Sequence, residues 1–419
     1  MSMSGTNVSH RGRMAASHRR RDQGGPAWLA AVAGLCASLV GLGLARFAYT
    51  PLIPALIADK WFSPTEAVYL GAANLAGYLV GALAARELGA RAGAVRTLRA
   101  MMIPATLCCF ACSAPVSLGW FFSRRFLAGL TGGVIMVLAA STILPHTAPS
   151  QRGVVGGVIF AGVGLGVALS GTLVPLLLQQ GLRQSWYGLG VLSALLTLAS
   201  WKAWPAEARV KDLMPDARAP SRGRPQIVLR LLSAEYGLNA LALVPHMIFL
   251  VDFVARGLGQ GITAGSHYWV LYGVGATIGP LLTGHLADRS GFGPALRVAL
   301  LIEAMAILLP ALNTAPVTMI VSSVIVGGFT PGIVPLVLGR IHELLPHSNA
   351  DQRAAWAQAT TVFALFQAAG AYGLSYLFQR TGGDYIILFV IGAGAVTASL
   401  GIDLVTALTI GRERKPHGN

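Results

Sequence analysis

Charged side chains are scarce along the whole chain, and acidic ones are the scarcest. Only 11% of the 419 residues are Asp, Glu, Lys or Arg, and only 16 of them are acidic. A soluble domain carries about a quarter charged residues, so the composition excludes an ordinary soluble protein. The shortage of acids also leaves few groups that could carry a proton.

Cysteine is rare as well. The four cysteines are Cys36, Cys108, Cys109 and Cys112, and all of them fall inside apolar runs. Cys108 and Cys112 share a helix face, but no further ligand nearby completes a metal site, so packing is the favoured interpretation. We therefore expect no metal centre.

Motifs for catalysis and for nucleotide binding are missing. The sequence offers no nucleophile with a plausible base and no phosphate-binding loop. "GVGLGV", which begins at Gly162, lies within a hydrophobic run and does not follow a strand, so a dinucleotide site is excluded. We expect a protein that is not an enzyme, needs no cofactor and is not an ATP-driven pump.

Long apolar runs dominate the sequence. Hydrophobic residues make up 54% of the chain, and the mean hydropathy is +0.63. The runs are about 20 residues long, enough for a helix to cross a ~30 Å hydrocarbon layer, and they lack the alternation of a membrane barrel. We predict an all-α integral membrane protein. Its twelve spans lie near 27–54, 65–85, 95–114, 117–144, 153–178, 185–204, 231–254, 266–287, 295–312, 316–345, 354–379 and 385–409.

The net charge of +15 is distributed unevenly between the two ends of these spans. If the N-terminus is cytoplasmic, 24 of the 31 Lys and Arg residues lie on the inner side and only four in the outer connections. This bias predicts that both termini are cytoplasmic. The positive charge then reflects topology and contact with anionic lipid, and we expect no nucleic acid partner.

One polar, Pro-rich segment divides the chain. Residues 205–230 are too polar to insert in a bilayer, so they predict a flexible cytoplasmic linker between two six-helix bundles at 27–204 and 231–410. Residues 1–26 and 411–419 form basic cytoplasmic tails, and the first of these lacks a small-residue cleavage site. "GALAAR" (Gly81–Arg86) recurs as "GHLADR" (Gly284–Arg289), which indicates parallel repeats with a site at their interface.

Several motifs resemble those of the major facilitator superfamily. "GHLADRSGFGPALR" (Gly284–Arg297) is similar to the motif between the second and third helices of each half, and "RFLAGLTGG" (Arg125–Gly133) to the fourth-helix pattern. "ARFAYTPLIPAL" and "GGFTPGIVPLVLGRIHELLP" resemble the YbfB/YjiJ-like branch. The resemblance implies alternating access around a central site, in a monomer of the bacterial inner membrane.

The resemblance also implies a conformational latch at the inner ends of the helices. In the family, the acid of the first motif helps to hold the outward-facing state, and here that role is carried over only to Asp288, with Gly284, Arg289 and Arg297 beside it. The first copy of the motif has Ala85 at the acidic position. The fifth span resembles the family's glycine-rich helix and predicts a packing hinge at Gly162, Gly164, Gly166 and Gly171.

Two arginines inside the spans are the leading site candidates. Charge within the bilayer is expensive and marks function by default. Arg46 lies in the first span and Arg125 in the fourth, and both helices line the central cavity of the implied fold. Two guanidiniums there suit an anionic solute, although each could instead reach the headgroups or pair with an acid. Arg124 is expected at the headgroups.

Three groups are candidates for proton coupling: Asp252, Glu303 and His246. Asp252 could instead form a local pair with Arg256, four residues on, and His246 could be a packing histidine. Neutral polar residues on cavity-lining helices complete the candidates for solute binding, although such residues also tie helices together. They are Tyr49, Asn74, Tyr78, Asn239, Gln367 and Tyr372, with His246 as a further candidate.

These observations favour a secondary transporter of a small organic solute, anionic or amphipathic, with the lipid bilayer and H⁺ as further partners. Exchange or uniport without proton coupling stays open. The alternative from another class is a membrane sensor or receptor on the same scaffold.

Overall fold

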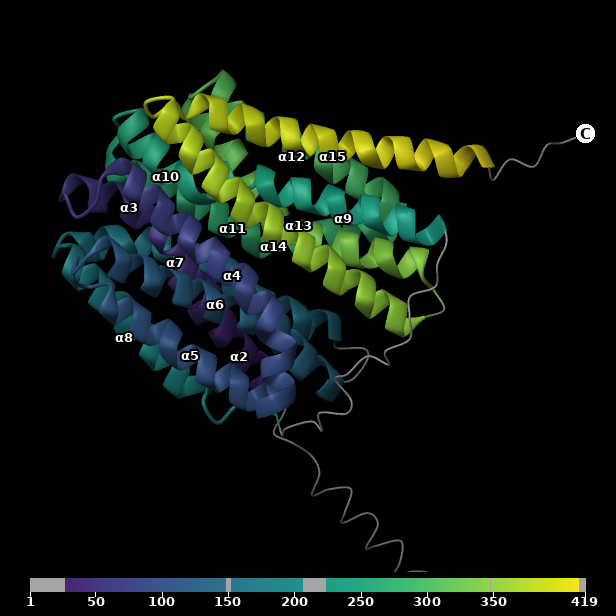
Figure 1. Cartoon of the computed structure of the whole chain (residues 1–419), viewed down its shortest axis with the longest axis horizontal. Helices are drawn as coiled ribbons and strands as arrows, with labels where there is room; N and C mark the ends of the chain where they lie inside the picture. The colour runs from purple at the N-terminus through teal and green to yellow at the C-terminus, as the bar shows by residue number, and fades with distance from the viewer. Residues whose placement is uncertain (1–26, 148–151, 206–223, 347, 414–419) are drawn as a thin grey trace, which may run out of the picture.

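The computed structural model describes residues 27–147, 152–205, 224–346 and 348–413, and every regular element in these ranges is a helix. Eleven helices are long and apolar enough to cross a membrane. They form two groups, one from each half of the chain (Figure 1). The described part of the chain is therefore all-helical, as the apolar runs of the sequence predict.

The first half begins with a continuous helical stretch whose middle is π-helical. It contains α2 (Ala27–Ser38), η1 (Leu39–Phe47), α3 (Tyr49–Ala58), α4 (Pro64–Ala92), α5 (Ala94–Ala111), α6 (Leu118–Ile143), η2 (Leu144–His146), α7 (Arg152–Leu178) and α8 (Leu182–Ser200).

The second half repeats this design, including π-helical turns in its first span. It contains α9 (Arg224–Ala242), η5 (Pro245–Phe249), α10 (Leu250–Asp252), η6 (Phe253–Gly257), α11 (Gly261–Ser290), α12 (Phe292–Leu312), α13 (Pro316–Leu344), α14 (Asn349–Arg380) and α15 (Ile386–Glu413). The helix α9 begins at Arg224, inside the segment predicted as linker, whereas residues 206–223 and the tail 1–26 lie outside the described residues.

The helix α8 occupies the place of the predicted sixth span but is not among the eleven. Its first turns are polar and aromatic, "LRQSWY", which lowers its hydropathy. It packs against α5 and leaves an apolar stripe of Val191, Leu195 and Leu198 exposed. A stripe of this spacing is one helix face.

Glycines allow the helices within each half to approach closely. A methyl group on Gly77 would lie 1.9 Å from the carbonyl oxygen of Phe126, and one on Gly129 would lie 1.8 Å from that of Asn74. The helices α4 and α6 therefore touch backbone to backbone. Gly275 and Gly327 bring α11 and α13 together in the same way.

The two halves meet along α7 with α11 and along α4 with α14. The Trp269 indole on α11 donates to the Ser170 hydroxyl on α7 at 3.0 Å, and the rings of Tyr69 and Tyr372 lie 6.2 Å apart between α4 and α14. Figure 1 shows α4 and α14 running side by side at this junction.

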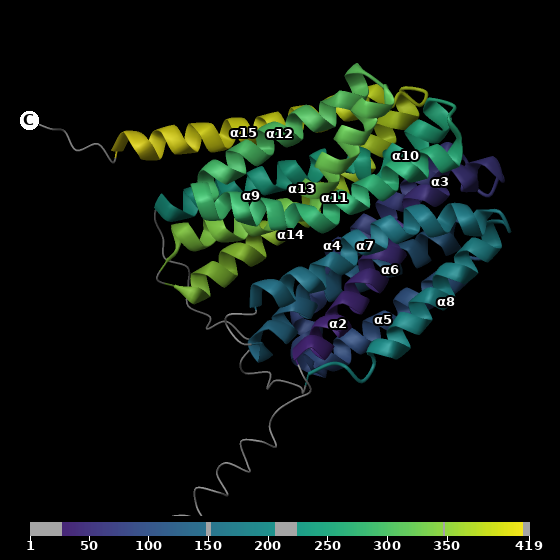
Figure 2. The ribbon, with the colours of Figure 1, turned by 180° about the vertical axis from the view of Figure 1, so that it is seen from behind.

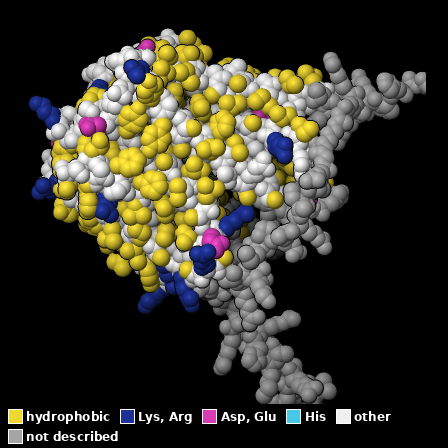
Figure 3. Space-filling model, in the orientation of Figure 1, with side chains coloured by type: hydrophobic (Ala, Val, Ile, Leu, Met, Phe, Trp, Pro, Cys, Tyr) yellow, Lys and Arg dark blue, Asp and Glu magenta, His cyan; other side chains and the backbone are white. Residues whose placement is uncertain are grey.

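The halves are close at one end and separate toward the other. At the end we call the closed end, α3 packs against η5 and α10, and the Thr50 hydroxyl donates to the carbonyl of Met247 at 2.6 Å. The ribbons diverge toward the opposite end, which we call the splayed end, in both Figure 1 and Figure 2. Hydrophobic side chains cover most of the face in Figure 3, with Lys and Arg at its rims.

Candidate solute site between the two halves

Arg46 lies on the π-helical turn η1 and is enclosed between the halves. It is only 9% exposed, and its guanidinium lies over the rings of Phe47 and Tyr78 at 5.0 and 4.8 Å. Its Nη2 donates to the amide oxygen of Gln367 at 2.7 Å, across the junction from α14. No Asp or Glu among the described residues pairs with this charge, and its Nε is buried without a partner.

Arg125, on α6, directs its donors to the backbone of η1. Its Nη1 donates to the carbonyl of Ala45 at 2.6 Å and its Nη2 to that of Arg46 at 3.4 Å. A π-helical turn changes the main-chain pairing of a helix, and Arg125 supplies donors to two of the carbonyls in this turn. The two arginines lie in one region, but Arg125 supports the turn that carries Arg46.

Two of the predicted solute-binding candidates, Tyr49 and Asn74, contact Arg125. The ring of Tyr49 lies 4.2 Å from its guanidinium carbon, and the Tyr49 hydroxyl donates to the carbonyl of Ala67 at 2.7 Å. Asn74 donates to the main-chain carbonyl of Arg125 at 3.0 Å, while its own side-chain oxygen is buried without a partner. Tyr372 lies apart from this group, against Tyr69.

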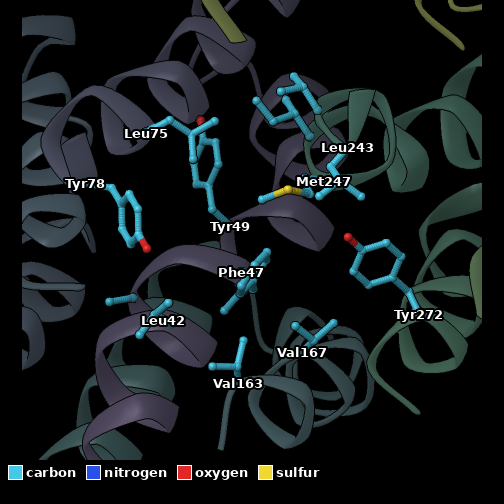
Figure 4. Packing of buried hydrophobic residues seen from close by; sticks show 14 of the residues in the cluster. Leu42, Phe47, Tyr49, Leu75, Tyr78, Val163, Val167, Leu243, Met247 and Tyr272 are labelled. Carbon is cyan, nitrogen blue, oxygen red and sulfur yellow. The ribbon is translucent and has the colours of Figure 1, made fainter. Parts of the chain in front are cut away.

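A cavity of about 20 Å³ lies beside the two arginines. Figure 4 shows Phe47, Tyr49 and Tyr78 of the first half and Met247 and Tyr272 of the second half around this central region. A volume of this size holds about one water molecule, so an organic solute needs the side chains to withdraw. The lining residues are Arg46, Phe47, Tyr49, Thr50, Ile53, Gly71, Asn74, Leu75, Arg125, Met247 and Ile248.

A second buried polar group lies within the second half. Asn239 on α9 donates to the carboxyl Oε2 of Glu303 on α12 at 2.6 Å. Glu303 is fully buried, its Oε1 has no partner, and no Lys or Arg among the described residues pairs with it. An unpaired carboxyl in the core of a helix bundle is unusual, since ionised acids are rarely buried without a cation.

His246 lies on η5, in the first span of the second half, as Arg46 does in the first half. Its Nε2 lies 2.8 Å from the Ser322 hydroxyl, which in turn donates to the carbonyl of Ala306 at 2.7 Å. The ring packs edge-on against Phe389, and Nδ1 is buried without a partner. His246 thus lies in the interior of the second half, and it does not line the central cavity.

Asp252 forms the local pair with Arg256, through two bonds of 2.5 Å. The Tyr385 hydroxyl, on the connection before α15, donates to the same carboxylate at 2.6 Å. Burial, followed by the charge of Asp252, raises the pKa of the Tyr385 phenol. Arg256 and Tyr385 also line a cavity of about 370 Å³ at the closed end, next to Pro64 and Thr65 of the first half.

The predicted glycine hinge divides into two faces of α7. A methyl group on Gly162 or Gly166 would meet Leu35 or Gly43 in the first span, whereas one on Gly164 or Gly171 would meet α11 in the other half. The residues of the predicted latch lie at the splayed end. Asp288 and Arg289 are exposed there, Gly284 has open space around it, and Arg297 pairs with Asp403 at 2.5 Å.

Three features of the site were not predicted from the sequence. No sequence motif marks the π-helical turns. One of them, η5, begins at Pro245, which has no N–H group to donate to the main chain and so interrupts the regular hydrogen bonding of the helix. Thr50 and Met247 join the halves, and neither residue type stands out in an apolar run. Glu235, which is 3% exposed with Oε2 unpartnered, could have been noticed as an acid near the start of a span.

Comparison with known proteins supports the resemblance seen in the motifs. The profile of the family described as "Uncharacterised MFS-type transporter YbfB" matches residues 38–404. The crystal structure of a D-xylose-proton symporter is similar, with a TM-score of 0.69 and 15% identity, over 90% of this chain and 96% of that chain. A comparison with curated proteins finds no match. Because the profile spans most of its length, the chain belongs to the YbfB-type family of major facilitator superfamily transporters.

Proposed function

We propose that the protein is a secondary transporter of a small organic anion, with Arg46 as the residue that binds the anionic group. The observation that carries this proposal is a buried guanidinium between the halves whose only side-chain acceptor, among the described residues, is a neutral amide. A buried charge without an opposite charge is costly. A carboxylate of the solute supplies that opposite charge in a geometry that fits the guanidinium fork.

The proposed transport cycle opens and shuts the closed end and the splayed end in turn. In this proposal α8 is the sixth span and completes a set of twelve. The splayed end faces the cytoplasm and the closed end faces outward, because basic residues favour the inner side. The protein then works as a monomer in the bacterial inner membrane, and alternate closing of the two ends exposes Arg46 to each side.

A thermal-shift screen of purified protein against carboxylates, neutral solutes and amines tests the anion site. We expect carboxylates to raise the Tm of the wild type and to have no effect on Arg46→Ala. Arg380→Ala is the matched control, because it removes an exposed arginine that contacts only Tyr376 in its own helix. Stabilisation by amines alone, unchanged in Arg46→Ala, would overturn the proposal. Uptake into proteoliposomes then separates a transporter from a receptor, which binds but does not move its ligand.

We further infer that a proton binds at Glu303 during the cycle. The support is its complete burial, the single hydrogen bond from Asn239 and the lack of a paired cation in the described part of the chain. Glu303→Gln should keep exchange of the solute across the membrane but remove the effect of a pH gradient on net uptake. Glu87→Gln, at an exposed pair, is the control. An unchanged response to pH in Glu303→Gln would show that Glu303 is not the coupling group, whereas no response to pH in the wild type would favour exchange or uniport.

A further inference from the structure

We propose that Gln367 is a specificity-determining residue: it occupies the anion position at Arg46 in the empty carrier, and only acceptors stronger than a neutral amide displace it. The inference rests on the proposed anion site and extends it. It assigns the preference for anions over neutral solutes to a residue of the opposite half.

The orientation of the Gln367 amide follows from the chemistry of its partner. A guanidinium has only donors, so the group that faces Arg46 Nη2 at 2.7 Å must be the amide oxygen. Gln367 is 2% exposed, so bulk solvent does not reach this contact. The amide oxygen therefore stands where an acceptor oxygen of a solute would bind.

The other end of the amide is held only weakly. Its Nε2 lies 3.5 Å from the sulfur of Met247, and a thioether is a poor acceptor. The unbranched Met247 side chain adapts readily when its neighbours move. The bond to Arg46 is thus the one strong bond of the amide, and a competitor needs to replace only that bond.

The strength of the competitor decides the outcome. A neutral carbonyl or hydroxyl exchanges one neutral acceptor for another at Arg46, so its net gain is small. The bond from Arg46 to Gln367 is already charge-assisted through its ionised donor. A carboxylate adds the opposite charge and can accept two parallel hydrogen bonds from the guanidinium fork, which a single neutral oxygen cannot do. Gln367 therefore sets a threshold that carboxylates pass and the corresponding neutral amides do not.

Displacement also loosens the junction between the halves. Arg46 belongs to η1 and Gln367 to α14, so their bond joins the two halves beside the Thr50–Met247 bond. Gln367 does not line the central cavity, but both of its partners, Arg46 and Met247, do. Withdrawal of its side chain therefore opens space next to a cavity that is too small for a solute. Solute binding and release of this contact are therefore one event.

The test compares Gln367→Ala and Gln367→Glu with the wild type, using acetate, succinate and benzoate beside acetamide, succinamide and benzamide as thermal-shift probes. Gln358→Ala, an exposed glutamine on the same helix, is the matched control. In Gln367→Ala we expect half-saturation by carboxylates at about five- to tenfold lower concentration, from the loss of one competing hydrogen bond, and new stabilisation by the amides. In Gln367→Glu the carboxylates should have no effect.

A measurement without any probe tests the contact itself. Gln367→Glu should raise the Tm of the ligand-free protein, because it places a carboxylate on Arg46, and this gain should vanish in the Arg46→Ala background. Loss of carboxylate binding in Gln367→Ala, as complete as in Arg46→Ala, would show that Gln367 is a solute ligand and would overturn the inference. Unchanged selectivity in Gln367→Ala would also overturn it. If no carboxylate stabilises the wild type, the anion site itself fails, and the assignment fails with it.

Discussion

Two buried arginines of the same region differ in what they bind. Arg46 has a neutral amide and two aromatic faces around it, whereas Arg125 donates to two main-chain carbonyls of η1. Both residues are charges within apolar runs, so the sequence predicts the same solute-binding role for each of them. On the basis of these partners, our proposal gives Arg46 the role of binding the solute and Arg125 the role of supporting Arg46.

Substitution of Arg125 should therefore reduce stability more than Arg46→Ala does. Arg125→Ala removes the side-chain donors to the carbonyls of Ala45 and Arg46, and each hydrogen bond to a charged group is worth about 1.5–3 kcal/mol. We expect a clear fall in Tm in detergent, with partial recovery in Arg125→Lys. An unchanged Tm combined with a lost response to carboxylates would instead make Arg125 a solute ligand.

The phenol of Tyr385 predicts a change of stability with pH at the closed end. Because its pKa is raised in the folded protein, the unfolded chain loses this proton first, near pH 10, and stability should fall as the pH rises further. Tyr385→Phe should cost about 1 kcal/mol at pH 7 through the lost bond to Asp252, and should make the fall above pH 10 shallower. The control is Tyr376→Phe, at an exposed tyrosine. Equal slopes in the two variants would contradict the prediction.

Helix α7 contacts both halves through its glycines. A methyl group placed on Gly166 would lie 2.3 Å from the Cα of Gly43. A methyl group placed on Gly164 would lie 2.6 Å from the main-chain nitrogen of Thr277 on α11. One face of the helix therefore belongs to the packing of its own half. The other face belongs to the junction between the two halves.

Alanine at these two positions should have different effects. Gly166→Ala forces apart two helices of the first half and should lower the Tm. Gly164→Ala acts at the junction and should lengthen the distance between spin labels at Lys60 and Arg380, both exposed at the closed end, with a smaller change in Tm. Gly119→Ala, which has open space around it, is the control. Equal losses of Tm without a change of distance would show that both faces only support the fold.

The molecule as a whole is closed at one end and splayed at the other, and the residues of the predicted latch lie at the splayed end. Asp288 is exposed at the splayed end and forms no ion pair within the described residues. The resemblance assigns Asp288 to the opposite state, in which the splayed end is shut. The resemblance thus predicts that this acid gains its partner only in the other state.

Removal of this charge should favour the splayed arrangement. In Asp288→Asn we expect the distance between spin labels at Arg86 and Ser290 to stay long when a stabilising carboxylate is added, whereas in the wild type it shortens in part of the population. The Tm of the ligand-free protein should not change, because Asp288 is exposed in this state. A distance distribution identical to that of the wild type, with and without solute, would remove Asp288 from the latch.

Much of this architecture follows from local properties of the sequence. Hydropathy and the distribution of Lys and Arg act on each segment by itself, and so they predict the membrane class, twelve spans and the division into two bundles. Eleven helices of the described residues are long and apolar enough to be such spans. The scarcity of charge in those spans also singles out Arg46. The sixth span is the weakest of these predictions, because the polar first turns of α8 reduce a signal that depends on composition alone.

The partners of the buried groups were decided only by the tertiary structure. Arg46 and Gln367 are 321 positions apart, and Asn239 and Glu303 are 64 apart, so no helical periodicity relates them. Which side chains meet depends on how glycine-lined helices cross and on π-helical turns that redirect individual carbonyls and side chains. The sequence alone identified a charge that needs an explanation. The packing of one half against the other determined that a neutral amide is what this charge contacts.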